Sequence, residues 1–128
     1  MRQYISTDKA PGAIGPYSQA VQVRDLIFTS GQIPLNPETG NVEGNGIEEQ
    51  TERVLKNLAE ILKAADSSLD HIIKTTCYLS DMNDFAKFNA CYARYITCSP
   101  ARSCVAVRAL PKSVLVEIEA IALRRQDV

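Results

Sequence analysis

Residues 47–65 repeat apolar side chains at the spacing of one helix face, and this stretch constrains the fold more than any other. The apolar positions recur three and four residues apart, which predicts a helix with a single apolar stripe: Ile47, Thr51, Val54, Leu55, Leu58, Ile61, Leu62 and Ala65. We expect Asn45 to cap this helix, with Glu48 completing a capping box, and residues 66–68 to end it. A helix of this kind has to bury its stripe against a sheet or another helix.

The rest of the chain supplies strands to pack against that helix. Ser80 and Asp81 are expected to begin a second helix, which Pro100 stops. Runs rich in β-branched and aromatic residues predict six strands, over residues 2–6, 17–23, 26–30, 71–80, 101–107 and 114–123. Two helices cannot cover both faces of six strands. We therefore predict an α/β fold in which both helices lie on one face of a six-stranded mixed sheet.

The last strand indicates what becomes of the other face. Val116, Ile118, Ala120 and Ala122 point one way and should meet the helices, because side chains alternate along a strand. The opposite face mixes aliphatic residues with Glu117 and Glu119. An apolar surface of that size usually meets another protein. We expect a homo-oligomer that buries the uncovered face; the alternative is a solvated face with scattered aliphatic residues.

Composition excludes several classes of protein. The chain has 128 residues, which suits one domain over 1–128, and its net charge of −1 predicts no nucleic-acid partner. No apolar run is long enough to span a membrane and the chain does not begin like a signal peptide, so a cytoplasmic location is expected. Cys77, Cys91, Cys98 and Cys104 lack the spacing of a zinc site, and the one histidine makes a metal site improbable. We expect reduced thiols and no metal.

Arg102 is the first candidate for chemistry. It shares one strand face with Cys104, two residues on. If residues 110–112 join the last two strands as a hairpin, Arg102 lies near Glu117 or Glu119. One interpretation is a structural ion pair. The other is an arginine that binds a ligand carboxylate through its planar fork of donors, beside a glutamate that handles a proton or a water.

Six motifs together resemble those of one known family. They occur in the expected order from about residue 8 to residue 125: Gly15–Gln19, Thr29–Pro34, Lys74–Thr76, Phe88–Asn89, Pro100–Cys104 and Val116–Ala122. This set is similar to that of the RidA (YjgF) family of enamine/imine deaminases.

The resemblance implies a chorismate-mutase-like α/β fold and a homotrimer whose sheets form an inner barrel, with sites in clefts between subunits. Arg102 matches the family's carboxylate-binding arginine, and Glu117 matches the residue that positions the attacking water. The remaining cleft positions match Tyr17, Ser30, Gly31, Asn89 and Cys104. Glu119 would have a supporting role.

The implied reaction is the hydrolysis of 2-iminobutanoate or 2-iminopropanoate, products of pyridoxal-phosphate-dependent dehydratases, to 2-oxo acids and ammonia. The resemblance implies no metal and no organic cofactor. Two departures from the family pattern are a short 96–99 loop, which would reshape one cleft wall, and Asp66, which stands at a left-handed position usually held by glycine. The alternative function is a small-carboxylate-binding regulatory or chaperone-like module without turnover. Ribonuclease activity and redox signalling through Cys104 are weaker alternatives.

Overall fold

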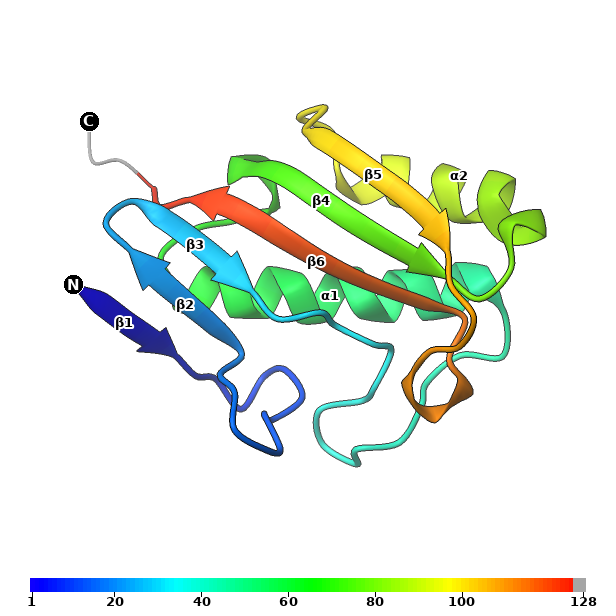
Figure 1. Cartoon of the computed structure of the whole chain (residues 1–128), viewed down its shortest axis with the longest axis horizontal. Helices are drawn as coiled ribbons and strands as arrows, with labels where there is room; N and C mark the ends of the chain where they lie inside the picture. Colours follow the sequence, from blue (N-terminus) through cyan, green and yellow to red (C-terminus); the bar gives the residue numbers. More distant parts are fainter. Residues whose placement is uncertain (126–128) are drawn as a thin grey trace.

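The computed structural model describes residues 1–125 and contains the strands and helices in the predicted order (Figure 1). Three short 3-10 turns accompany them, at Leu69–His71, Met82–Asp84 and Pro111–Ser113. The strands and helices are β1 (Arg2–Ile5), β2 (Ala20–Val23), β3 (Leu26–Thr29), α1 (Ile47–Ala64), β4 (Ile72–Leu79), α2 (Phe85–Tyr95), β5 (Ala101–Ala106) and β6 (Val116–Leu123).

The six strands form one mixed sheet in the order β1-β2-β3-β6-β4-β5. Strands β4 and β5 are parallel, and every other neighbouring pair is antiparallel. The expected hairpin between β5 and β6 is wrong, because β4 lies between them. Helix α2 carries the chain from β4 back to a parallel neighbour, as in a βαβ unit. The turn after β5 then opens into a wide connection, in which Lys112 and Ser113 both have φ of 55°.

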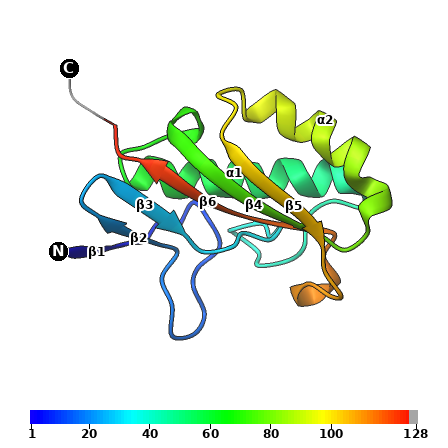
Figure 2. The same cartoon turned by 45° about the horizontal axis from the view of Figure 1, so that its top comes forward.

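Both helices lie on the same face of the sheet, as predicted. Figure 1 shows α1 behind the sheet. Figure 2 shows α2 next to α1, at the edge of the sheet formed by β5. The apolar stripe of α1 and the helix-facing side of β6 form the core, which includes Val54, Leu55, Leu58, Ile61, Leu62, Val116, Ile118 and Ala122. No helix in residues 1–125 is long and apolar enough to cross a membrane.

The ends of α1 differ in part from expectation. Gly46, and not Asn45, is the N-cap residue, and no side chain bonds to the free backbone amides there. The predicted capping box is therefore wrong. Glu48 and Glu49 still place negative charge in the first turn, where it favours the helix dipole. At the other end Asp66 has φ of 58°, which confirms the left-handed conformation expected for this position.

The second face of the sheet is not covered by any element of residues 1–125 (Figure 1). The half formed by β1, β2, β3 and the end of β6 carries exposed apolar side chains, which include Tyr4, Val23, Leu26, Phe28 and Leu123. The half formed by β4 and β6 is more polar. We call this whole surface the open face.

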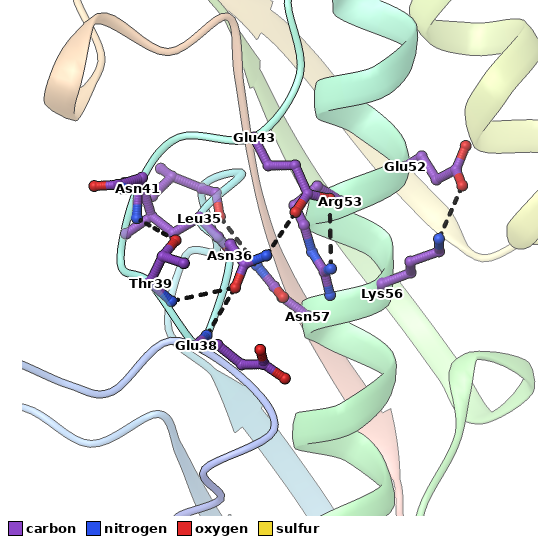
Figure 3. Close-up of polar contacts among 11 residues, drawn as sticks. Leu35, Asn36, Glu38, Thr39, Asn41, Glu43, Glu52, Arg53, Lys56 and Asn57 are labelled. Atoms are coloured by element: carbon purple, nitrogen blue, oxygen red, sulfur yellow. Dashed lines mark hydrogen bonds and ion pairs between the residues drawn. The ribbon is translucent and has the colours of Figure 1, made fainter.

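Helix α1 also anchors the long loop that follows β3. Asn57 is fully buried in α1, and its side-chain amide donates hydrogen bonds to the carbonyl oxygens of Ile33, at 3.3 Å, and Leu35, at 3.0 Å. Glu43 accepts a hydrogen bond from Asn36 and pairs with Arg53 of α1 at 3.5 Å (Figure 3). The loop is thereby fixed to the helix just beyond Gly31.

Candidate functional site

The segment after β3 brings Gly31 against Glu117. The backbone of Gln32 exchanges two hydrogen bonds with that of Ile118 in β6, at 2.8 and 3.1 Å. Glu117 precedes Ile118 and points to the open face, so its side chain meets the backbone of Gly31. A Cβ atom at Gly31 would collide with the carboxylate oxygen of Glu117 and lie 2.9 Å from its Cδ. Only glycine permits this approach without moving the carboxylate.

Tyr17 and Ser30 complete this region. Tyr17 was expected in a strand, but β2 begins only at Ala20 and Tyr17 lies in the irregular segment before it. The Ser30 hydroxyl donates to the carbonyl oxygen of Ser18 at 2.6 Å, which ties the segment to the end of β3. A cavity of about 260 Å³ is lined by Tyr17, Ser30, Gly31 and Glu117, among others. We call these four residues the glutamate group.

The surroundings of Glu117 favour its neutral form. Partial burial raises the pKa of its carboxyl above the usual range, and the negative charge of Glu119 raises it further. Glu119 lies two residues along the same strand face and accepts a hydrogen bond from the Tyr78 hydroxyl at 3.2 Å. A carboxylate whose pKa is raised toward neutrality is suited to taking up and returning a proton.

Arg102 lies on the other side of the sheet. It is paired with Thr75 across β4 and β5, and its side chain extends over α2. Its Nη1 donates to Oδ1 of Asn89 at 2.7 Å. The guanidinium carbon is 4.9 Å from the ring centre of Tyr92 and 5.6 Å from that of Phe85.

A second cavity, of about 420 Å³, adjoins this region and is lined by Asn89, Tyr92 and Arg102, among others. Cys104 follows two residues after Arg102 on the same strand, so the two share a face as predicted, and its side chain is half-buried. We call Asn89, Arg102 and Cys104 the arginine group.

The predicted approach of Arg102 to Glu117 or Glu119 within one chain is wrong. Strand β4 separates β5 from β6, and Arg102 lies on the helix-covered face whereas both glutamates lie on the open face. None of the ion pairs within residues 1–125 involves Arg102. The interpretation of Arg102 as the partner of either glutamate in a structural ion pair is therefore wrong within one chain.

Burial disfavours the thiolate form of Cys77 and Cys104. Burial raises the pKa of the Cys104 thiol, and the opposing effect of the Arg102 charge is the smaller one. Burial raises the pKa of Cys77 to about 12. Cys91 is also buried, whereas Cys98 is exposed. Within residues 1–125 no three His, Cys, Asp or Glu side chains gather as metal ligands.

Sequence reasoning missed some residues that shape these two groups. Tyr92 was not among the predicted site residues, although it follows Asn89 by three residues and so shares a helix face with it. That spacing was the available signal. Gln32 has no comparable signal, because its pairing with Ile118 joins segments far apart in the sequence.

Comparison with known proteins gives consistent matches along the whole fold. The family described as endoribonuclease L-PSP matches residues 7–124. AldR of Lactococcus lactis, named as a regulator, is 54% identical over 119 residues, which are 92% of this chain and 94% of AldR. The mouse 2-iminobutanoate/2-iminopropanoate deaminase is 51% identical over 125 residues, covering 97% of this chain and 93% of the mouse protein.

A solved structure extends the match to three dimensions. The crystal structure of Escherichia coli TdcF with bound serine superposes with a TM-score of 0.91 at 45% identity, covering 96% of this chain and 99% of TdcF. The predicted resemblance is thus confirmed. The chain belongs to the endoribonuclease L-PSP family, which is the RidA/YjgF family.

Proposed function

We propose that this protein is a 2-iminobutanoate/2-iminopropanoate deaminase that hydrolyses reactive imines to 2-oxo acids and ammonia. The observation that carries the proposal is the state of Arg102, whose guanidinium contacts neutral groups of α2 and forms no ion pair within residues 1–125. Asn89 accepts from one nitrogen, which leaves other donors of the guanidinium for a ligand. The name of the mouse relative supports the same activity.

Arg102 would bind the carboxylate of the 2-imino acid. The planar fork of a guanidinium donates two parallel bonds to a carboxylate, and such charge-assisted bonds are worth ~1.5–3 kcal/mol each. This contact fixes the adjacent imine carbon in the site. The serine bound to TdcF, a small molecule with a carboxylate, is consistent with this role.

Glu117 would activate the water. As the water oxygen bonds to the imine carbon, the carboxylate takes a proton from the water and the electron pair of the C=N bond moves to nitrogen. Return of that proton to nitrogen gives a carbinolamine, which carries a hydroxyl and an amino group on the same carbon. Glu117 then takes the hydroxyl proton and passes it to the amino nitrogen, so that the C–N bond breaks, ammonia leaves and the carbonyl of the 2-oxo acid forms. The raised pKa of Glu117 suits both transfers.

The site would be completed between two subunits of a homotrimer. Arg102 and Glu117 lie on opposite faces of one sheet, so a single chain does not present both to one small substrate. A head-to-tail assembly brings the arginine group of one copy to the glutamate group of the next. The exposed apolar side chains of the open face support an assembly that buries them, with the sheets forming an inner barrel.

The test couples the purified protein to a threonine dehydratase and follows 2-oxobutanoate formation while semicarbazide traps free imine. Wild type should outcompete the trap. Arg102→Ala and Glu117→Ala should each lose at least about 100-fold in kcat/KM, from lost carboxylate bonds and lost proton transfer respectively. Arg108→Ala, which removes an exposed arginine after β5, is the matched control and should remain active.

A folded, assembled wild type that does no better than buffer would overturn the proposal. If that protein still bound 2-oxobutanoate through Arg102, the regulatory module without turnover would replace it, in keeping with the name of AldR. Glu117 argues against that outcome, because a binder of carboxylates gains nothing from a second carboxylate at its site. Ribonuclease activity is not proposed, because the chain has a net charge of −1 and one histidine.

A further inference from the structure

Two aromatic rings that belong to neither the arginine group nor the glutamate group lie against the guanidinium of Arg102. We call these two residues, Tyr92 and Phe85, the aromatic seat. Tyr92 and Phe85, both on α2, lie 4.9 and 5.6 Å from the guanidinium carbon. An arginine over an aromatic face is attracted by the ring quadrupole, which makes the face electrostatically negative although the ring is neutral. The Asn89 oxygen, at 2.7 Å, adds one in-plane bond. These contacts together restrict both the position and the plane of the guanidinium.

Tyr92 is itself fixed by the core. Its hydroxyl lies 2.7 Å from Oγ1 of Thr75, and it is only 6% exposed. Thr75 is directly opposite Arg102 in the pairing of β4 and β5. Burial also raises the pKa of the Tyr92 hydroxyl, so this hydroxyl stays protonated at neutral pH. The ring beneath Arg102 is therefore set by the same pair of strands that presents the arginine.

We propose that Tyr92 and Phe85 are positioning residues that orient the Arg102 guanidinium for carboxylate binding. This inference rests on the proposed role of Arg102 in substrate binding. An arginine side chain that is free to rotate loses conformational entropy when it binds a carboxylate. The aromatic seat removes part of that cost before the ligand arrives, and preorganisation of this kind increases affinity. Neither ring is placed in contact with substrate.

The test compares Tyr92→Leu, which removes the ring, with Tyr92→Phe, which keeps it. The probe is 2-oxobutanoate, titrated calorimetrically, and kcat and KM are measured in the trap assay. Tyr92→Leu should weaken binding and raise KM by about fivefold, which equals ~1 kcal/mol, with kcat little changed. Tyr92→Phe should stay within about twofold of wild type, because the cation–π contact remains.

Tyr95→Leu is the matched control. Tyr95 lies on the same helix, but its ring is near Arg94, at 5.9 Å, and not near Arg102. Its loss should leave 2-oxobutanoate binding unchanged. Nuclear magnetic resonance provides a readout that a merely structural role would not change. The Arg102 Nε–H signal should carry a ring-current shift in wild type and in Tyr92→Phe, and lose most of it in Tyr92→Leu.

A folded Tyr92→Leu variant with wild-type binding and an unchanged Nε–H signal would overturn the inference. If Tyr92→Leu does not fold, Phe85→Leu tests the inference in its place, because Phe85 is only half-buried. Loss of the Phe85 ring should still weaken 2-oxobutanoate binding about twofold. Unchanged binding by Phe85→Leu would also overturn the inference. A wild type that binds no 2-oxobutanoate and hydrolyses no imine would contradict the proposed function. In that case the ring-current shifts still show whether the seat orients Arg102.

Discussion

The two groups of candidate residues are built by opposite means. The arginine group depends on side chains, because Arg102 is held by one amide oxygen and two aromatic rings of α2. The glutamate group depends on backbone, because the pairing of Gln32 with Ile118 presses Gly31 against Glu117. A substitution in the first group removes a contact, whereas one in the second displaces a carboxylate. Variants of the two groups should therefore fail in different ways.

The largest expected effect is recovery of activity by mixing subunits. Arg102→Ala and Glu117→Ala, denatured and refolded together in equal amounts, should regain about a quarter of wild-type activity if each site takes one group from each of two neighbouring copies. Arg102→Ala mixed with the Arg102→Ala/Glu117→Ala double variant should regain none, because no complete site can form. Failure of the first mixture to recover would show that the two groups do not meet across subunits.

Gly31→Ala should reduce kcat about tenfold, by moving Glu117 away from the position in which it takes the proton from water. The added Cβ would lie 2.9 Å from the Cδ of Glu117 and 3.1 Å from its Cγ. Gly12→Ala is the control, because a Cβ there meets nothing within 4 Å. Equal activity of the two variants would mean that Glu117 does not need its present position.

Glu119→Gln should shift the acid limb of the pH–rate profile. The charge of Glu119 contributes to the raised pKa of Glu117, so its removal lowers that pKa. Activity that requires ionised Glu117 should then persist to lower pH, by a fraction of a pH unit. Glu38→Gln, in the exposed loop, should leave the profile unchanged. A shift toward higher pH would contradict the proposed electrostatic coupling of the two glutamates.

Glu117→Gln should produce the smallest effect, a gain in stability that grows with pH. Below pH ~4 the carboxyl is protonated in both the folded and the unfolded chain, so the substitution changes little. At higher pH the unfolded chain loses its proton more readily than the folded chain, whose pKa is raised, and ionisation therefore favours unfolding. Thermal unfolding from pH 4 to 8 should show a Tm difference that widens toward neutral pH; a constant difference would contradict this account.

Much of the fold was predictable because periodicity reports which face of an element is buried. The apolar stripe of α1 and the alternation in β6 both matched the observed core. Element ends were less predictable. Asn45 is a favourable cap residue by type, yet the helix begins after Gly46, because cap preferences are small beside the packing of the apolar stripe.

The composition of the candidate site was predictable, but its geometry was not. Arg102 and Cys104 share a face, as their spacing of two requires in any strand. Asn89 was identified only through the resemblance to the family, and its bond to Arg102 appears in the structure. The hairpin that placed Glu117 beside Arg102 was wrong, because local sequence around residues 110–112 does not reveal which strand becomes the neighbour of β5.

By itself, the sequence determined the order of elements, the face of each that is buried, and the family. Those properties follow from local side-chain patterns and from motifs. The tertiary structure alone decided that β4 enters between β5 and β6. It also set the register, in which Arg102 pairs with Thr75 and Glu117 with Tyr78, so that the two side chains lie on opposite faces of the sheet. Strand neighbours are chosen by contacts between distant segments, whose energies depend on the packing of the whole sheet and not on any one stretch of chain.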